Sequence, residues 1–516
     1  MILIWDWNKL LHGGRTRPMF KSILKKNILA NFGGKAWSGL IQLVFVPLYI
    51  KFLGMEAFGL IGFFLMLQGL LSLLDLGLST TLNRELARRY AKGNVQEARD
   101  LVRTMEWIYW SIAIVIAAGI IIVAPWIARL WVNVKGLPVQ SVQHAIVLMG
   151  LVIAAQWPFS LYSGGLAGLQ KQVLLSIIRA SMSTIQAGGA VLVLWLISQS
   201  IEAYFIWQIG IVGIQTVLTG YFLRSSLPKS AKAATFNRDL LRQCWRFAAG
   251  MTGISAVAII LTQTDKVILS KLLSLEQFGY YMLAFTLGST LIYLVSPVST
   301  ALFPKLSELV ATGKTEELSR LYHKGCQAVS LFVFPAGILM VLFPQEILIL
   351  WTRDPRIVEN TDLLVSIFVI GFLLNAMLTM PFMLQLAYGW TSLSFYKNII
   401  AIIILIPLLF LLVPYLGAVA GAITWVLLMA GCVLFEIPLM HRRLISRDMW
   451  RWYIIDIGLP MVCCIIIGAI LKMLFPDNGT TLMRLTILAI AFGSMFLACA
   501  LALPFSRRYL MRVISW

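Results

Sequence analysis

The sequence contains little charge, little cysteine and little histidine for its length. Only 12% of its 516 residues are charged, about half the share of a typical globular domain. Its six cysteines and four histidines do not stand at the spacing of a zinc site or a redox motif, and no disulfide is expected. We therefore predict neither a cofactor nor a metal, and an ordinary soluble protein is excluded.

Long apolar runs fill the chain instead, and hydrophobic residues make up 59% of it. Runs near 20 residues match the hydrocarbon core of a bilayer at the rise of an α-helix. The sequence predicts an all-α polytopic membrane protein with about 14 transmembrane helices. Their expected limits are 27–50, 56–80, 104–127, 144–168, 173–197, 201–223, 247–272, 276–301, 325–349, 362–388, 392–413, 416–439, 453–475 and 483–505.

The net charge of +20 arises from basic residues that gather in alternate loops. With both termini in the cytoplasm, roughly 30 of the 42 Lys and Arg fall on the inside, as the positive-inside rule requires. No soluble segment interleaves aromatic and basic residues, so a nucleic-acid partner is excluded. The distribution predicts a multi-pass protein of the bacterial inner membrane.

An internal repeat relates the two halves of the chain. Residues 51–101 align without gaps on residues 271–321, an offset of 220, with about 15 identities in about 50 positions. Trp131 and Trp351 keep the same offset. Two parallel lobes around a central cavity indicate a transporter that works by alternating access. The expected division is an N-terminal cytoplasmic segment (1–26), an N-lobe of six helices (27–223), a cytoplasmic linker (224–246), a C-lobe of six helices (247–440), and two extra helices with a cytoplasmic tail (441–516).

Several short stretches resemble a known family. They are NFGGK at 31–35, PLY at 47–49, FLG at 52–54, EAFGL at 56–60, DLGL at 75–78, RELAR at 84–88, QTDK at 263–266 and FGY at 278–280. The chain resembles the O-antigen type polysaccharide flippases of the multidrug/oligosaccharidyl-lipid/polysaccharide exporter superfamily. The resemblance implies movement of undecaprenyl-diphosphate-linked oligosaccharides across the inner membrane, in a pathway that builds O-antigen or a similar surface polysaccharide. The first 18 residues have no counterpart in that pattern, so a translation start at Met19 is one hypothesis.

Three cations fall inside the predicted spans near the cytoplasmic side. Lys35 belongs to the first span, Arg179 to the fifth and Lys397 to the eleventh. Charges are costly in a bilayer and tend to face a cavity or a partner. Ammonium and guanidinium groups pair well with phosphate oxygens, so we predict these three as substrate-binding residues. The alternative is that each side chain extends to the cytoplasmic interface.

Two acids and a set of amides are further candidates. Asp75 and Asp265 could couple transport to protons or sodium ions, or could pair with a cation instead. Lys266 follows Asp265 but should point about 100° away on a helix, so the two are not expected to pair. Amides suit hydroxyl-rich cargo because they both donate and accept, although they could equally bridge helices. The amides within the predicted spans are Gln42, Gln68, Gln156, Gln186, Gln208, Gln263, Asn375 and Gln385.

Two other functions are alternatives to the flippase. An ion-coupled multidrug exporter of the same superfamily would favour an acidic or aromatic cavity, whereas Lys35 and Arg179 favour an anionic cargo. A polysaccharide polymerase or glycosyltransferase would need a long outer loop or a soluble domain, which the hydropathy pattern lacks. We therefore predict that the protein is not an enzyme. The expected partners are the lipid-linked substrate, membrane lipids, a coupling ion, and a polymerase with its chain-length protein.

Overall fold

The computed structural model describes residues 18–507 apart from residues 229, 231 and 476–479. It describes side chains from residue 33 onward, without those of residues 35, 243–252 and 254. Within these residues the chain is built of helices and contains no named strand. Helices satisfy every backbone group inside one segment, which is what a bilayer demands. The predicted all-α membrane fold is confirmed.

Thirteen helices of the described residues are long and apolar enough to cross a membrane. They cover all the predicted spans except the seventh. The seventh corresponds to α8 (Arg238–Leu272), which is 35 residues long and therefore about 50 Å in length. The first lobe ends with α7 (Ile201–Ser226), so the connection between the lobes is shorter than the predicted 224–246.

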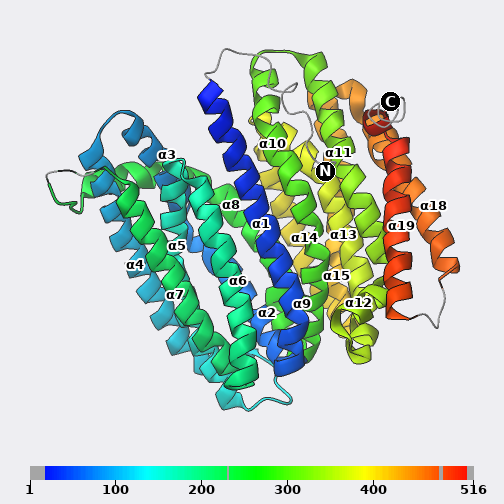
Figure 1. Ribbon diagram of the computed structural model, residues 1–516, viewed down its shortest axis with the longest axis horizontal. Coiled ribbons are helices and arrows are strands. Elements are labelled where there is room, and N and C mark those ends of the chain that lie inside the picture. Colours follow the sequence, from blue (N-terminus) through cyan, green and yellow to red (C-terminus); the bar gives the residue numbers. More distant parts are fainter. Residues whose placement is uncertain (1–17, 229, 231, 476–479, 508–516) are drawn as a thin grey trace.

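The first lobe comprises α1 to α7, and α3, α4 and α7 pack around α5. Besides α7, its elements are α1 (Pro18–Leu53), α2 (Met55–Leu71), η1 (Ser72–Asp75), α3 (Leu78–Ala91), α4 (Val95–Trp126), η2 (Ile127–Trp131), α5 (Val139–Gly168) and α6 (Gln172–Leu196). Helix α5 packs against both α4 and α7, whereas α1 packs against α6. In Figure 1, α3 to α7 gather on one side and α1 stands between the two lobes.

The second lobe begins with α8 and repeats this arrangement around α13. Its other elements are α9 (Leu275–Ser289), α10 (Leu291–Ala311), α11 (Thr315–Leu342), α12 (Pro344–Thr352), α13 (Pro355–Ala387), α14 (Ser392–Leu416), α15 (Val419–Gly431), η3 (Cys432–Glu436) and α16 (Ile437–Leu444). Helix α13 packs against α11 and α15, and α8 packs against α14 as α1 does against α6. The offset of 220 residues therefore relates equivalent packing in the two lobes.

The predicted second span is interrupted rather than continuous. It was expected to run over 56–80, but α2 ends at Leu71, a single 3₁₀ turn follows, and α3 begins at Leu78. Leu76 and Gly77 have φ values of 49° and 71°, in a region that ends a helix and that glycine adopts at little cost. The equivalent place in the second lobe is the junction of α9 and α10 at Thr290. The break places Asp75 in a turn.

The last two membrane helices attach to the second lobe through a buried polar cluster. They are α18 (Leu459–Met473) and α19 (Thr481–Ala502), which follow the short elements η4 (Ser446–Asp448), α17 (Met449–Arg451) and η5 (Trp452–Gly458). Both helices pack against α11 at the outer edge of the lobe (Figure 1). The Asp456 carboxylate bonds the His323 imidazole and accepts from Gln327 Nε2 at 2.8 Å. Ser330 Oγ donates to the Asp456 carbonyl at 2.6 Å.

Replacing Asp456 with alanine should weaken this attachment. Asp456, His323 and Gln327 are each at most 2% exposed, so the change takes the carboxylate away from two buried polar side chains that bond to it. Breaking a buried pair from one side costs on the order of 3 kcal/mol. We expect the unfolding temperature in detergent to fall by several degrees for D456A and by less for D456N, which keeps one acceptor. An unchanged unfolding temperature for D456A would contradict the prediction.

The two lobes close on each other at one end through α2 and α9. A Cβ atom on Gly59 would overlap the carbonyl oxygen of Leu275, and one on Gly279 would lie 2.6 Å from the carbonyl oxygen of Met55. Gly59 and Gly279 are related by the offset of 220, and so are Met55 and Leu275. Small residues allow such close helix contact in membranes. The contact is therefore two-fold symmetric, and only glycine fits at its centre.

Repeat-related tryptophans reinforce this closed end. Trp131 Nε1 donates to Ser270 Oγ of the second lobe at 3.1 Å. Trp351 Nε1 donates to the Leu43 carbonyl of the first lobe at 3.0 Å. Leu275 N also donates to the Asn133 carbonyl at 2.9 Å. Each lobe thus extends one tryptophan onto the first helix of the other, Trp131 onto α8 and Trp351 onto α1.

Candidate functional site

Two cavities lie between the lobes, one after the other along α2 and α8. The Lys266 cavity has a volume of about 200 Å³, and the Asp75 cavity has one of about 430 Å³. Along α2, Gln68 of the Asp75 cavity stands nine residues, or about 14 Å, beyond Gly59 of the closed end. The Lys266 cavity is therefore nearer the closed end, and the Asp75 cavity is nearer the basic loops.

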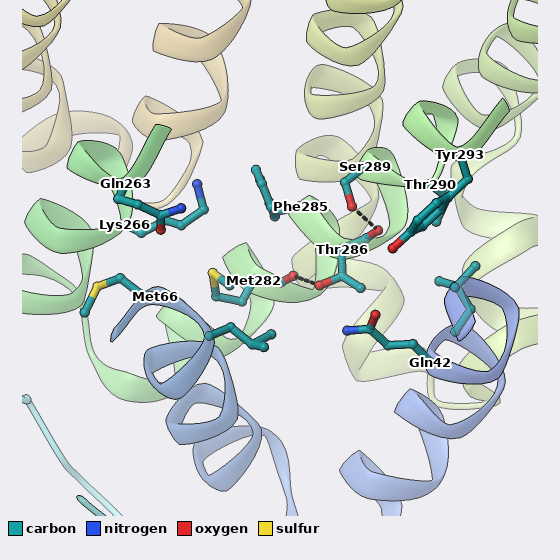
Figure 2. A pocket seen from close by; sticks show the side chains of 13 residues that line it. Gln42, Met66, Gln263, Lys266, Met282, Phe285, Thr286, Ser289, Thr290 and Tyr293 are labelled. Carbon is teal, nitrogen blue, oxygen red and sulfur yellow. Dashed lines mark hydrogen bonds between the residues drawn. The ribbon is translucent and has the colours of Figure 1, made fainter. Parts of the chain in front are cut away.

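Helices of both lobes build the Lys266 cavity. Figure 2 shows Gln42 of α1 and Met66 of α2 opposite Gln263 and Lys266 of α8 and the side chains of α9. The hydroxyls of Thr286 and Ser289 donate to backbone carbonyls of α9, at 2.7 and 2.8 Å. The wall is completed by Gly39, Leu43, Leu65, Met282, Phe285, Thr290 and Tyr293. Lys266 is the charged residue of this wall.

Asp265 and Lys266 form an ion pair, so the expectation that they point apart is wrong. Lys266 Nζ lies 3.2 Å from Asp265 Oδ2 and donates to the Thr262 carbonyl at 2.8 Å. The long lysine stem bends back along the helix and so overcomes the separation of the two Cβ directions. The ammonium also stands over the Phe285 ring, 4.0 Å from its centroid. The Tyr281 hydroxyl donates to Asp265 Oδ2.

Asp75 lies in the wall of the second cavity and is held by hydroxyl groups. Tyr109 and Ser160 donate to its Oδ1 at 2.5 and 2.8 Å. Ser79 donates to its Oδ2 at 3.0 Å. None of these bonds joins Asp75 to a cation, so the predicted alternative of an ion pair finds no support in the described residues. Trp157 and Phe159 add aromatic surface to the same wall.

The amide of Gln263 belongs to the wall of the Lys266 cavity and packs against α2. A Cβ atom on Gly69 would lie 2.7 Å from Gln263 Nε2, so the side chain rests against a gap in the surface of α2. Gln263 Oε1 is buried without a hydrogen-bond partner among the described residues. A buried unsatisfied carbonyl costs about 1–3 kcal/mol, which a bound donor would recover. A donor bound in the Lys266 cavity could therefore satisfy the Gln263 carbonyl.

The predicted cation Arg179 lies beside the Asp75 cavity. Its guanidinium stands over the Phe159 ring at 5.6 Å, and Phe159 lines that cavity. The structure gives Arg179 no ion pair within the described residues. Lys35 belongs to α1, which packs against the helix of Arg179. Its side chain lies outside the described residues.

The third predicted cation, Lys397, has a buried partner that sequence reasoning missed. Lys397 Nζ donates to Glu436 Oε2 at 2.9 Å, and Glu436 is 5% exposed. Gln385 Nε2 donates to the other oxygen of Glu436 at 2.9 Å. Lys397 does not belong to the wall of either cavity. Glu436 falls within the predicted span 416–439, so the rule that selected Asp75 would also have selected it.

The eight predicted amides divide into two groups. Four line the cavities, namely Gln42, Gln68, Gln156 and Gln263. The other four bond elsewhere: Gln186 to Gln208, Asn375 to the Met429 sulfur, and Gln385 to Glu436. Within the described residues, no group of three or more His, Cys, Asp and Glu could hold a metal ion. The polar groups of the two cavities are therefore amides, hydroxyls, one carboxylate and one ammonium.

Comparison with known proteins supplies the family. A profile described as "Polysaccharide biosynthesis protein" matches residues 24–310, more than half of the chain. The chain belongs to the polysaccharide biosynthesis protein family. A second profile, MatE, matches residues 251–411. A protein of Shigella flexneri named "Putative O-antigen transporter" is 22% identical over 401 residues, which cover 78% of this chain and 93% of that protein.

Solved structures share the fold of this polysaccharide biosynthesis family member. The lipid II flippase MurJ in an inward closed conformation has a TM-score of 0.69 at 13% identity, covering 90% of this chain and 97% of the other. An inward-facing MATE family multidrug resistance transporter of the MOP superfamily has a TM-score of 0.64 at 14% identity, covering 80% and 96%. The family resemblance noted in the sequence is confirmed, and the helices long enough to cross a membrane agree with a multi-pass membrane protein.

Proposed function

We propose that the protein translocates undecaprenyl-diphosphate-linked oligosaccharide repeat units across the bacterial inner membrane by alternating access. The main support is the placement of two cavities, each with several polar side chains in its wall, between pseudo-symmetric lobes that meet at one end. Amides and hydroxyls suit sugar hydroxyls, and an ammonium suits a phosphate oxygen. The polyprenyl tail remains in the lipid while the polar part crosses between the lobes.

The orientation of the chain sets the direction of transport. With both termini in the cytoplasm, the basic loops face inward and the α2–α9 contact faces outward. Cargo then enters past the basic loops, reaches the Asp75 cavity and afterwards the Lys266 cavity, and leaves when the closed end opens. A polymerase and a chain-length protein would take up the product on the outer side, as in the assembly of O-antigen in lipopolysaccharide.

The predicted site residues have separate places in this mechanism. Arg179 and Lys35 would meet the diphosphate as it enters, and Lys397 would do so only if the cargo displaced Glu436. Asp75 and Asp265 are the proposed ion-coupling residues, since each lies at a cavity or beside one. Protonation of either would release its hydroxyl or ammonium partner and so loosen the contacts around it.

Multidrug export is a second candidate because of the Asp75 cavity. A carboxylate flanked by Trp157 and Phe159 could hold an organic cation through charge and ring contacts. The MatE profile matches part of the second lobe. The Lys266 ammonium would repel an organic cation, whereas it would attract the diphosphate of a lipid-linked cargo.

A deletion strain of the native host separates the two functions. Loss of surface polysaccharide, with lipid-linked units accumulating on the inner leaflet, would support the flippase, and the intact gene should restore the polymer. Unchanged polymer together with increased sensitivity to cationic dyes would instead favour the exporter. Proteoliposomes that carry lipid-linked units extracted from the host provide a direct second measurement of translocation.

A further inference from the structure

We infer that Lys266 binds a phosphate anion near the closed end of the path between the lobes, and that its ammonium is exchanged between Asp265 and that anion. This inference rests on the proposed function, because the anion it assigns is the diphosphate of the lipid-linked cargo. It adds a binding residue that the sequence pattern did not select.

The position of Lys266 is the first reason. The residue is 4% exposed, yet it lines a cavity of about 200 Å³ (Figure 2). A water molecule needs about 10–15 Å³ of such volume, so the cavity has room for a small polyatomic anion. A buried charge inside a membrane is costly and generally marks a functional site.

The bonding of the pair permits an exchange. Lys266 Nζ lies 3.2 and 3.3 Å from the two Asp265 oxygens, which is longer than the usual 2.7–2.9 Å of a charge-assisted hydrogen bond. The Tyr281 hydroxyl also donates to Asp265. Asp265 therefore keeps a donor when the ammonium turns away, so the carboxylate is not left unpaired. The ammonium in turn exchanges one anionic partner, the Asp265 carboxylate, for another, the phosphate.

The neighbouring groups complete a site for an anion with hydroxyl-bearing substituents. Gln42 has no hydrogen-bond partner among the described residues and reaches into the cavity from α1 (Figure 2). Gln263 presents an amide whose oxygen is unpartnered. The ammonium and the amide donors can bind phosphate oxygens, and the free amide oxygen can accept from a sugar hydroxyl.

The pair is absent from the other lobe. At the offset of 220, Asp265 and Lys266 correspond to Phe45 and Val46 of α1. Helices α1 and α8 pack equivalently, against α6 and α14, so this helix position does not need an ion pair in order to fold. The charges are therefore an addition to one lobe, at the place where that lobe faces the cavity.

Inorganic pyrophosphate is the probe that tests the exchange. Its affinity for purified protein in phosphatidylcholine nanodiscs would be measured by calorimetry at fixed ionic strength. Removing the ammonium in K266M should weaken binding by at least about tenfold, the value of a charged hydrogen bond, and K266R should largely retain it. Removing the competing carboxylate in D265N should strengthen binding severalfold. Exchange therefore predicts that pyrophosphate affinity falls in K266M and rises in D265N.

A purely structural pair predicts a different result. In that case D265N and K266M would both weaken binding, or neither would change it, and either outcome would overturn the inference. The matched control is the Glu346–Lys472 ion pair between α12 and α18, outside both cavity walls, where E346Q and K472M should leave the affinity unchanged. If K266M does not give monodisperse protein, the sign of the D265N effect decides the question.

Two further measurements separate the possible sources of failure. Nanodiscs of phosphatidylglycerol should not weaken pyrophosphate binding, and competition by that lipid would overturn the assignment of the site to the cargo. Translocation of lipid-linked units is measured independently in proteoliposomes. If the protein translocates lipid-linked units but K266M and D265N do not change pyrophosphate affinity in opposite directions, the exchange is wrong and the flippase function stands. If the two variants do change the affinity in opposite directions but nothing is translocated, the anion site stands and the flippase function is wrong.

Discussion

Leucine in place of Gly59 or Gly279 is expected to abolish most transport, because it prevents the lobes from closing at the α2–α9 contact. Even a Cβ atom at either position would overlap a carbonyl oxygen of the facing helix or nearly do so. Backbone atoms cannot move aside as a flexible side chain can. Overpacking costs about 1–3 kcal/mol or more, which shifts a two-state equilibrium by about 5- to 150-fold.

The readout is translocation in proteoliposomes, together with the unfolding temperature of each variant. The two glycines are related by the repeat, so G59L and G279L should have similar effects, and alanine should have a smaller one. Gly119 of α4 is the matched control, since a Cβ atom there meets nothing within 4 Å. If both leucine variants transport like the wild type, the contact is not part of the transport cycle.

Charge reversal at Arg179 is expected to remove surface polysaccharide in the native host. Glutamate at this position would place a carboxylate next to Phe159, at the wall that already contains Asp75. A diphosphate would then meet two acids instead of an acid and a guanidinium. Losing one charged hydrogen bond costs about 1.5–3 kcal/mol, so we expect a decrease of roughly tenfold or more. K35E should act in the same direction, as the sequence predicts.

The amount of each variant in the membrane and the accumulation of lipid-linked units on the inner leaflet would be measured together with the amount of surface polysaccharide. Arg129 is the control, because it is exposed at the opposite end of the first lobe and undergoes the same change of charge in R129E. Normal polymer in both R179E and K35E would exclude these residues from the cargo path. Enhanced export of cationic dyes by R179E would then favour the multidrug function.

The candidate site was only partly accessible from the sequence. The cost of charge in a bilayer selected Asp75, Asp265 and Arg179, and each lies at a lobe-interface cavity or contacts a residue of its wall. The same rule could not tell that Lys397 faces Glu436. The two are 39 residues apart, and their contact depends on how two helices pack. Helical spacing also could not predict the ion pair of Lys266 with Asp265, because it gives the directions of the Cβ atoms and not the conformation of a long side chain.

The sequence by itself determined the class of this protein, its helices, the duplication of its lobes and its family. These follow from apolar length, from the alternation of basic loops and from identities at a fixed offset, all of which are properties of the chain read in order. Only the tertiary structure decided which side chains share a cavity and where the lobes close. Gly59 and Leu275 lie far apart in the sequence, and their contact depends on how α2 and α9 pack. Close helix contact in a bilayer requires two surfaces of matching shape, and the sequence of one helix does not show which surface it will meet.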